Sequence, residues 1–233
     1  MTYIHTLICT VGTSLFGGSL LTLSNSEDST ERQSRQEKII SAYDSMNWKT
    51  LAQELLEIDP GSRICGAEIN AVEALRQKGI ARPENLVLLV PNTPAGLDTG
   101  RFLKIYFEKR QDMNLKNVEV LLVENLPNND SARLGTGEAK DIIQTMKDCM
   151  RRFGSPEEVA IVVTCKNDAL KSMAVRAKQV LNVPVFYKHE NSPELTELPT
   201  LLVSDYDNVS TDKTSILDFP GPKEGHFRVK SVR

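Results

Sequence analysis

Short, unbroken runs of apolar residues alternate along the chain with longer stretches in which apolar residues return about every 3.6 positions. Unbroken runs are typical of parallel strands covered on both faces, whereas the 3.6-residue period is that of an amphipathic helix. The runs that predict strands are His5–Thr10, Asn85–Val90, Val118–Val123, Val159–Thr164 and Val183–Tyr187, with a shorter piece at Thr200–Ser204.

Between the strands, helices are indicated by apolar stripes and by capping residues. Asn47 precedes a predicted helix from Trp48 to Ile58, and Asp98 precedes one that begins near Thr99; both side chains can accept hydrogen bonds from free helix amides. Two later stripes consist of Ile142, Met146, Cys149 and Phe153, and of Leu170, Met173, Ala177 and Val180. The alternation predicts an α/β fold with a doubly wound, mostly parallel sheet and right-handed crossovers.

The regular pattern covers residues 1–204, which we interpret as one domain, and residues 205–233 as a C-terminal tail or small appendage. A chain of 233 residues is long enough for one sizeable α/β domain but would leave two domains small. The polar segment Ser24–Lys38 predicts either a flexible loop or the exposed start of a helix.

Charge and cysteine content narrow the function. The net charge of −3 disfavours a surface for long nucleic acid, but allows a small polyanion held by amides and a few cations. Neither a membrane-spanning run nor a secretory signal is present, so we expect a cytoplasmic protein without a membrane partner. Cys9 and Cys149, among apolar neighbours, predict buried thiols. The scattered cysteines and histidines indicate no zinc site, and we expect neither metal nor cofactor.

The first predicted strand ends in TVGTSLFGG, Thr10–Gly18. The glycines allow tight backbone turns, and Thr10, Thr13 and Ser14 supply hydroxyl groups beside exposed amides. Such a loop can wrap a phosphate or a sugar edge. Because the pattern is neither G-x-G-x-x-G nor a P-loop, an ordinary strand-to-helix turn stays equally open.

The second strand ends in VPNTPAGLDTGRF, Val90–Phe102. Asn92 and Thr93 stand where a ligand-facing loop would begin, and Arg101 follows in the next helix. The alternative is a turn rich in proline and glycine with a solvated arginine. We leave both interpretations open for Arg101.

The fourth strand ends in VVTCKNDAL, Val162–Leu170. The polar residues directly beyond its apolar run are Thr164, Cys165, Lys166, Asn167 and Asp168. A lysine at this edge can neutralise charge that develops on phosphodiester oxygens. Asp168 is better suited to capping the helix that follows.

Five segments, in order along the chain, resemble the stand-alone CRISPR-associated Rossmann-fold (CARF) proteins of type III CRISPR systems, which include ring nucleases. They are VGTSL at Val11–Leu15, GAEINAVEAL at Gly66–Leu75, NLVLLVPNTPAGLDTGRFL at Asn85–Leu103, TCKNDALKSMA at Thr164–Ala174 and VPVFYKHENSPELTELPTL at Val183–Leu201. In the third segment the family more often has Ser-Asp-Thr than Pro91-Asn92-Thr93. The resemblance spans roughly Ile4–Val203 and implies a Rossmann-like CARF domain.

The resemblance further implies a homodimer that binds cyclic oligoadenylate, commonly cyclic tetra-adenylate, across its two-fold axis. In such ring nucleases a ribose 2′-hydroxyl attacks the adjacent phosphorus without metal, which leaves 2′,3′-cyclic phosphate ends. By this resemblance Ser14 positions the ribose or phosphate, with the amides of Gly12, Thr13 and Leu15 alongside. The ligand contacts predicted for the other loops are Asn92, Thr93, Arg101, Thr164, Cys165, Asn167 and Asp168.

The chain departs from the family after the fourth strand. Relatives usually carry a Thr-Gly-Gly-Phe-Lys loop there, whereas this chain has Asp168 at the position of that lysine. Lys166 is then the second catalytic candidate beside Ser14. The departure keeps a non-catalytic sensor or sponge for the same ligand open. An unrelated nucleotide-binding enzyme of the same fold class, such as a transferase, is a third interpretation.

Overall fold

The computed structural model describes residues 3–12, 30–58, 65–124, 126, 135–165, 168–189, 194–199, 216–220 and 226–230. The chain separates into two compact units, Met1–Leu198 and Pro199–Arg233. In the second unit, strands β7 (Ile216–Pro220) and β8 (His226–Lys230) form an antiparallel pair.

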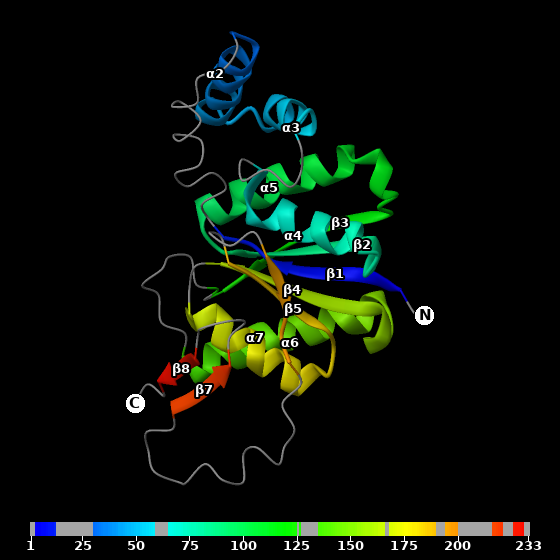
Figure 1. Cartoon of the computed structure of the whole chain (residues 1–233), viewed down its shortest axis with the longest axis vertical. Helices are drawn as coiled ribbons and strands as arrows, with labels where there is room; N and C mark the ends of the chain where they lie inside the picture. Colours follow the sequence, from blue (N-terminus) through cyan, green and yellow to red (C-terminus); the bar gives the residue numbers. More distant parts are fainter. Residues whose placement is uncertain are drawn as a thin grey trace. The chain divides into compact units, whose positions relative to one another are not determined.

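The first unit is built on a six-stranded sheet with the order β3-β2-β1-β4-β5-β6 (Figure 1). The strands are β1 (Ile4–Thr10), β2 (Ala81–Pro91), β3 (Asn117–Val123), β4 (Val159–Cys165), β5 (Val185–His189) and β6 (Leu195–Glu197). The first five strands pair in parallel, and β6 runs antiparallel to β5. The predicted doubly wound, mostly parallel α/β fold is therefore confirmed.

Helices cover both faces of the sheet. The α-helices described in the first unit are α2 (Thr30–Asp44), α3 (Trp48–Leu56), α4 (Gly66–Gln77), α5 (Pro94–Lys109), α6 (Thr136–Phe153) and α7 (Asp168–Leu181). Helices α4 and α5 lie on one face and α6 and α7 on the other (Figure 1). Helix α3 packs on the outside of α5, where the rings of Trp48 and Phe102 meet edge to face.

The core consists of two apolar layers, one on each face of the sheet. Along β1, Leu7 and Cys9 face the layer under α4 and α5, while Ile8 faces the layer under α6 and α7. All three are fully buried, as the unbroken apolar pattern predicted for a strand covered on both faces. The buried thiols predicted for Cys9 and Cys149 are likewise confirmed.

The start of α5 differs from the prediction. Thr93, not Asp98, caps this helix: the Thr93 hydroxyl accepts the amide of Gly96 at 3.1 Å, and Pro94 takes the first helical position. Proline suits that position because its φ angle is preset and its missing N–H is not needed. Asp98 lies inside the helix instead. The cap predicted at Asn47 is confirmed, since its side chain accepts the amide of Thr50 at 3.2 Å.

The structure differs from the prediction at Val180, agrees with it for the polar segment and does not test it for residues 200–204. Val180 is 58% exposed, so the buried stripe of α7 ends with Leu181 and not with Val180. The polar segment forms the exposed start of a helix for its described part, because α2 begins at Thr30. Residues 200–204, the weakest strand candidate, lie outside the described residues.

Two glycines let α5 lie close against the sheet. A Cβ atom on Gly96 would collide with the carbonyl oxygen of Pro91, at the end of β2. A Cβ atom on Gly100 would stand 2.8 Å from Cγ1 of Val120 in β3. The close approach of α5 to β2 and β3 therefore depends on residues without side chains.

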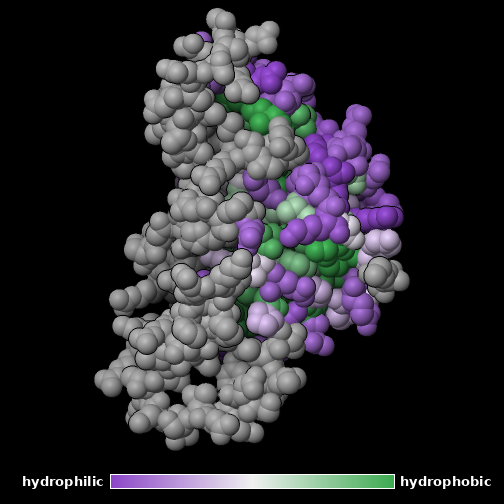
Figure 2. Space-filling model, in the orientation of Figure 1, coloured by the Kyte–Doolittle hydropathy of each residue, from purple (hydrophilic) through white to green (hydrophobic). Residues whose placement is uncertain are grey.

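The surface is more hydrophilic than the two apolar layers of the core. On the side shown in Figure 2, the coloured surface is mainly hydrophilic, and hydrophobic residues show only in separate patches. Within the described part of the chain, no helix combines the length and the apolar content that crossing a membrane requires.

Candidate functional site at the strand ends

The order of the strands places one position of special interest between β1 and β4. From β1 the chain adds β2 and β3 on one side, and it then crosses over to place β4 and β5 on the other. In open α/β sheets, ligands bind outside the carboxyl ends of the strands where the order reverses. The fold therefore directs the search to the carboxyl ends of β1 and β4.

Four residues are joined there by hydrogen bonds, and we call them the strand-end junction: Thr10, Gly12, Glu68 and Thr164. Oε1 of Glu68 accepts the backbone N–H of Gly12 at 3.0 Å and lies 3.0 Å from the Thr164 hydroxyl. That hydroxyl also lies 2.8 Å from the carbonyl oxygen of Thr10. Its single proton is thus shared between two acceptors. The amide of Thr164 reaches the Thr10 hydroxyl at 3.3 Å, which closes the network.

Three residues of the strand-end junction are almost free of solvent, and Gly12 is partly exposed. Thr10 is 0% exposed, Thr164 1% and Glu68 6%. Buried polar groups are retained only where they are hydrogen-bonded, and here each bond joins segments distant in sequence. The two threonines, predicted as ligand contacts, are thus committed to holding the ends of β1 and β4 together.

Two residues that the sequence analysis did not single out belong to this end of the sheet. Glu68 stands in the first turn of α4, where a negative charge is favoured by the helix dipole. Lys188 of β5 is only 5% exposed and is the register partner of Thr164. Because side chains alternate along a strand, Lys188 shares with Phe186 the face that α4 covers.

The environment of Glu68 also affects a neighbouring thiol. Burial raises the pKa of the Cys9 thiol far above its usual range, and the negative charge of Glu68 raises it further. Only a thiolate is an effective nucleophile or metal ligand. Cys9 is therefore an inert part of the core, although it lies one residue before the strand-end junction.

The residues predicted after β2 have structural partners of their own. The side-chain amide of Asn92 donates to the carboxylate of Glu124, and its backbone N–H donates to the Val123 carbonyl at 3.1 Å. These bonds join the ends of β2 and β3. Thr93 caps α5, as described above. Arg101 is 60% exposed on α5 and lies 3.5 Å from a carboxylate oxygen of Asp98. It takes no part in the hydrogen bonds described for the strand-end junction, and its contact with a ligand stays a prediction.

The remaining predicted contacts lie outside the described residues. These are Thr13, Ser14, Leu15, Lys166 and Asn167. For Cys165 and Asp168 only the backbone is described: Cys165 ends β4, and Asp168 is the first residue of α7. In the sequence, Thr13 directly follows the junction residue Gly12, and Lys166 follows Thr164 by two positions. That Ser14 and Lys166 flank one pocket stays a prediction.

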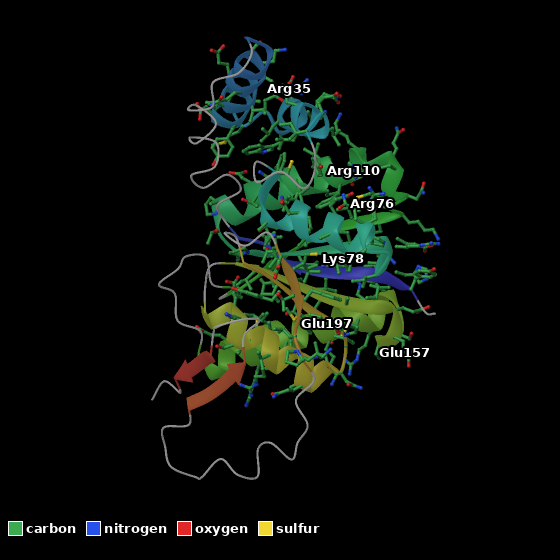
Figure 3. The ribbon with its side chains drawn as sticks, in the orientation of Figure 1. Arg35, Arg76, Lys78, Arg110, Glu157 and Glu197 are labelled. Atoms are coloured by element: carbon green, nitrogen blue, oxygen red, sulfur yellow. The ribbon has the colours of Figure 1, made fainter. Side chains whose placement is uncertain are left out.

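A second polar cluster, only partly buried, lies at the opposite, amino-terminal edge of the sheet. Glu73, near the end of α4, accepts hydrogen bonds from Arg76 and from Arg110, whose Nη2 is 3.1 Å from Oε2. Arg110 also binds Asp112 at 2.7 Å and the hydroxyl of Tyr106 at 3.3 Å. Figure 3 shows Arg76 and Arg110 close together beside the ends of α4 and α5. We call these five residues the arginine cluster.

Ionisation in the arginine cluster follows from its contacts. Burial opposes the charge of Glu73, but the hydrogen bonds and charges of Arg76 and Arg110 outweigh it and hold the pKa of Glu73 below its usual value. The hydrogen bond from Arg110 lowers the pKa of Asp112 in the same way. Burial raises the pKa of Tyr106. The cluster is therefore a paired, charged anchor and not an acid–base site.

Neither the strand-end junction nor the arginine cluster has the composition of a metal centre. Among the residues that the structure describes, no three His, Cys, Asp or Glu side chains gather closely enough to hold a metal ion.

Fold and site together define a class: a doubly wound α/β protein with a polar junction at the point where its strand order reverses. The comparison with protein families adds a particular relationship. The chain belongs to the family described as CRISPR-associated protein (Cas_APE2256), which matches residues 63–201, more than half of its length. The match includes Glu68, Thr164 and Lys188, but not the loop after β1. A search of curated proteins found no match.

Proposed function

We propose that the protein binds cyclic oligoadenylate, specifically cyclic tetra-adenylate, at the carboxyl ends of β1 and β4. It opens the ring without metal and thereby damps type III CRISPR signalling. The observation that carries this proposal is the family match, which makes the chain CRISPR-associated. The polar junction at the strand reversal supports it, because such reversals are where folds of this class bind ligands.

The proposed reaction needs only atoms of the ring. A ribose 2′-oxygen, as it loses its proton, attacks the adjacent phosphorus, and the bond from phosphorus to the 5′-oxygen breaks. The 5′-oxygen takes up a proton, which leaves a linear product with a 2′,3′-cyclic phosphate and a 5′-hydroxyl end. The protein has to align the attack and stabilise the added negative charge. In this proposal Ser14 positions the ribose or phosphate, and Lys166 neutralises the charge.

The proposal includes a homodimer. A cyclic tetra-adenylate has two-fold symmetry, and a C2 interface presents the same groups of each subunit to equivalent adenylates. One subunit then contacts half of the ring. Sedimentation of the purified protein with and without the ring tests this part, and a monomer that binds the ring with full affinity contradicts it.

Cleavage is tested by incubating the purified protein with cyclic tetra-adenylate in the presence of EDTA and separating the products by liquid chromatography. We expect linear products with 2′,3′-cyclic phosphate ends. A ring methylated at its 2′-oxygens should bind but resist opening. An intact unmodified ring after prolonged incubation with excess protein refutes the proposed cleavage.

Two substitutions separate catalysis from binding. We expect Ser14→Ala and Lys166→Ala to slow ring opening more than they weaken ring affinity, because both groups are proposed to act on the transition state. Arg151→Ala serves as the control, since Arg151 is exposed on α6 and pairs only with Asp148 among the salt bridges described. Equal losses of rate and affinity in the two test variants would assign them to ground-state binding.

One observation favours a second candidate function, a non-catalytic sensor or sponge for the same ligand. Asp168 occupies the position at which the resembling proteins carry a lysine. Calorimetric binding of cyclic tetra-adenylate without turnover would select this candidate. Failure to bind any cyclic oligoadenylate would point instead to another nucleotide-binding protein of the same fold class.

A further inference from the structure

The Glu68 side chain connects the ends of β1 and β4 at a point where the two strands are no longer paired by backbone hydrogen bonds. The ladder between β1 and β4 ends with the pair Thr10 and Val163. Beyond that pair, Gly12 has left the strand, while Thr164 still pairs with β5. The Glu68 carboxylate, contributed by α4, accepts a hydrogen bond from Gly12 and contacts the Thr164 hydroxyl through one oxygen. Glu68 thus supplies the acceptor for the Gly12 amide, which has no partner in the β1–β4 ladder.

Burying the Glu68 carboxylate at this position costs free energy. A buried carboxylate loses its hydration, and an apolar side chain of similar size would avoid that loss. What an apolar residue cannot do is accept the Gly12 amide and bind Thr164 at the same time. The carboxylate therefore contributes defined geometry at the place where the chain leaves β1 and β4.

We propose that Glu68 is the positioning residue of the ligand site. Its Oε1 sets the separation of Gly12 and Thr164 at the carboxyl ends of β1 and β4. The identity of the ligand in this inference rests on the proposed function. The geometric role of Glu68 does not, and it can be measured without any ligand.

Hydrogen exchange of backbone amides tests the geometric role. In Glu68→Ala the Gly12 amide loses its acceptor, and we expect it to exchange at least about tenfold faster, together with faster exchange at Thr164. Glu68→Gln keeps an oxygen acceptor and should retain most of the protection. Glu68→Asp keeps the charge on a shorter side chain and should resemble Glu68→Ala, which covers the case in which the alanine variant fails to fold.

The matched control lies on the same helix. Glu73 is also buried, but it stands at the opposite edge of the sheet. Glu73→Gln should lower thermal stability while it leaves the exchange of the Gly12 amide unchanged under native conditions. An unchanged Gly12 amide in both Glu68→Ala and Glu68→Asp would overturn the inference.

Calorimetric titration with cyclic tetra-adenylate, well below the melting temperature of each variant, tests the consequence for binding. We expect Glu68→Asp and Glu68→Ala to lose about tenfold or more in affinity, and Glu68→Gln to stay within about threefold of the wild type. Glu73→Gln should bind like the wild type. Rescue by glutamine but not by aspartate is a result that a general loss of stability would not produce.

The two proposals fail in different ways. If the wild-type protein does not bind the ring, the proposed function is refuted, and hydrogen exchange still decides the role of Glu68. If the wild type binds and the Glu68→Ala variant binds equally well, the positioning role is refuted while the proposed function stands.

Discussion

Helix α4 carries two buried glutamates, five positions apart, which lie at opposite edges of the sheet. Glu73, 2% exposed, is held by the guanidinium groups of Arg76 and Arg110 at the amino edge of the sheet. Oε1 of Glu68, at the carboxyl edge, is held by a backbone amide and a hydroxyl group. The difference teaches that burial alone does not assign a role to an acid: the first glutamate anchors the fold through charge, and the second sets the geometry of a candidate site.

The largest effect that separates the two regions is expected from Arg110→Ala. This change removes one of the two guanidinium partners of Glu73 and of Asp112, since Arg76 still contacts both. Arg110 binds both acids and the hydroxyl of Tyr106, and hydrogen bonds of charged groups contribute about 1.5–3 kcal/mol each, so we expect a loss of about 3 kcal/mol of unfolding free energy. Urea denaturation measures the loss. The control is Arg151→Ala, whose exposed pair with Asp148 should contribute less than about 1 kcal/mol. Equal stabilities of the two variants would contradict the anchoring role of the arginine cluster.

A smaller effect is expected from Gly96→Ala at the carboxyl edge, where α5 lies close against the end of β2. The added methyl group would meet the carbonyl of Pro91, so the start of the helix has to shift, at a cost of about 2 kcal/mol. A methyl group on Gly137 in α6 would have nothing within 4 Å, so Gly137→Ala should be neutral or slightly stabilising. Differential scanning calorimetry compares the pair. A Gly96→Ala melting temperature at or above that of Gly137→Ala would show that α5 has room to adjust.

The smallest expected effect is the change in stability between neutral and mildly acidic pH that comes from ionisation of the arginine cluster. The pKa values of Glu73 and Asp112 are lowered below their ordinary values of 4.5 and 3.8. Their contribution to stability is therefore fully present above these ordinary values and is lost as the pH falls through the lower, folded-state values. Thermal unfolding at pH 7, 5, 4 and 3 should show little change from this cluster above pH 5 and a decline below about 4.5. Arg110→Ala should reduce that decline, and an identical pH profile in both proteins would exclude the cluster as its source.

The elements of the fold could be predicted from the sequence wherever their packing requires a regular pattern of apolar residues. Strands β1, β2, β4 and β5 coincide with apolar runs that are buried on both faces of the sheet. The edge strand β3 was also predicted, although Glu119 interrupts its apolar run and Leu122 is 49% exposed. The early part of β2, which includes Pro83, and the three-residue strand β6 have no such pattern and were missed. Proline is unusual in a strand, and three residues are too few to show a period. The start of α5 was misplaced although Thr93 and Pro94 together are a recognisable helix-start signal.

The candidate site was accessible only in part. Glycines and hydroxyls at strand ends indicated where to look, and Thr10, Gly12 and Thr164 do meet there. Glu68 was missed because an acidic residue in the first turn of a helix is ordinary, and local sequence does not distinguish a solvated acid from a buried one. Its role appears only when the fold brings residues 56 and 96 positions away to the same oxygen.

One consequence follows from the way α4 is used. Its 12 residues extend about 18 Å, and the arginine cluster lies at its carboxyl-terminal end. Substitutions around the other end can therefore accumulate without loosening that anchorage. A scaffold of this kind is suited to divergence in what it recognises, because selection on ligand choice and selection on folding act on separate turns of one helix.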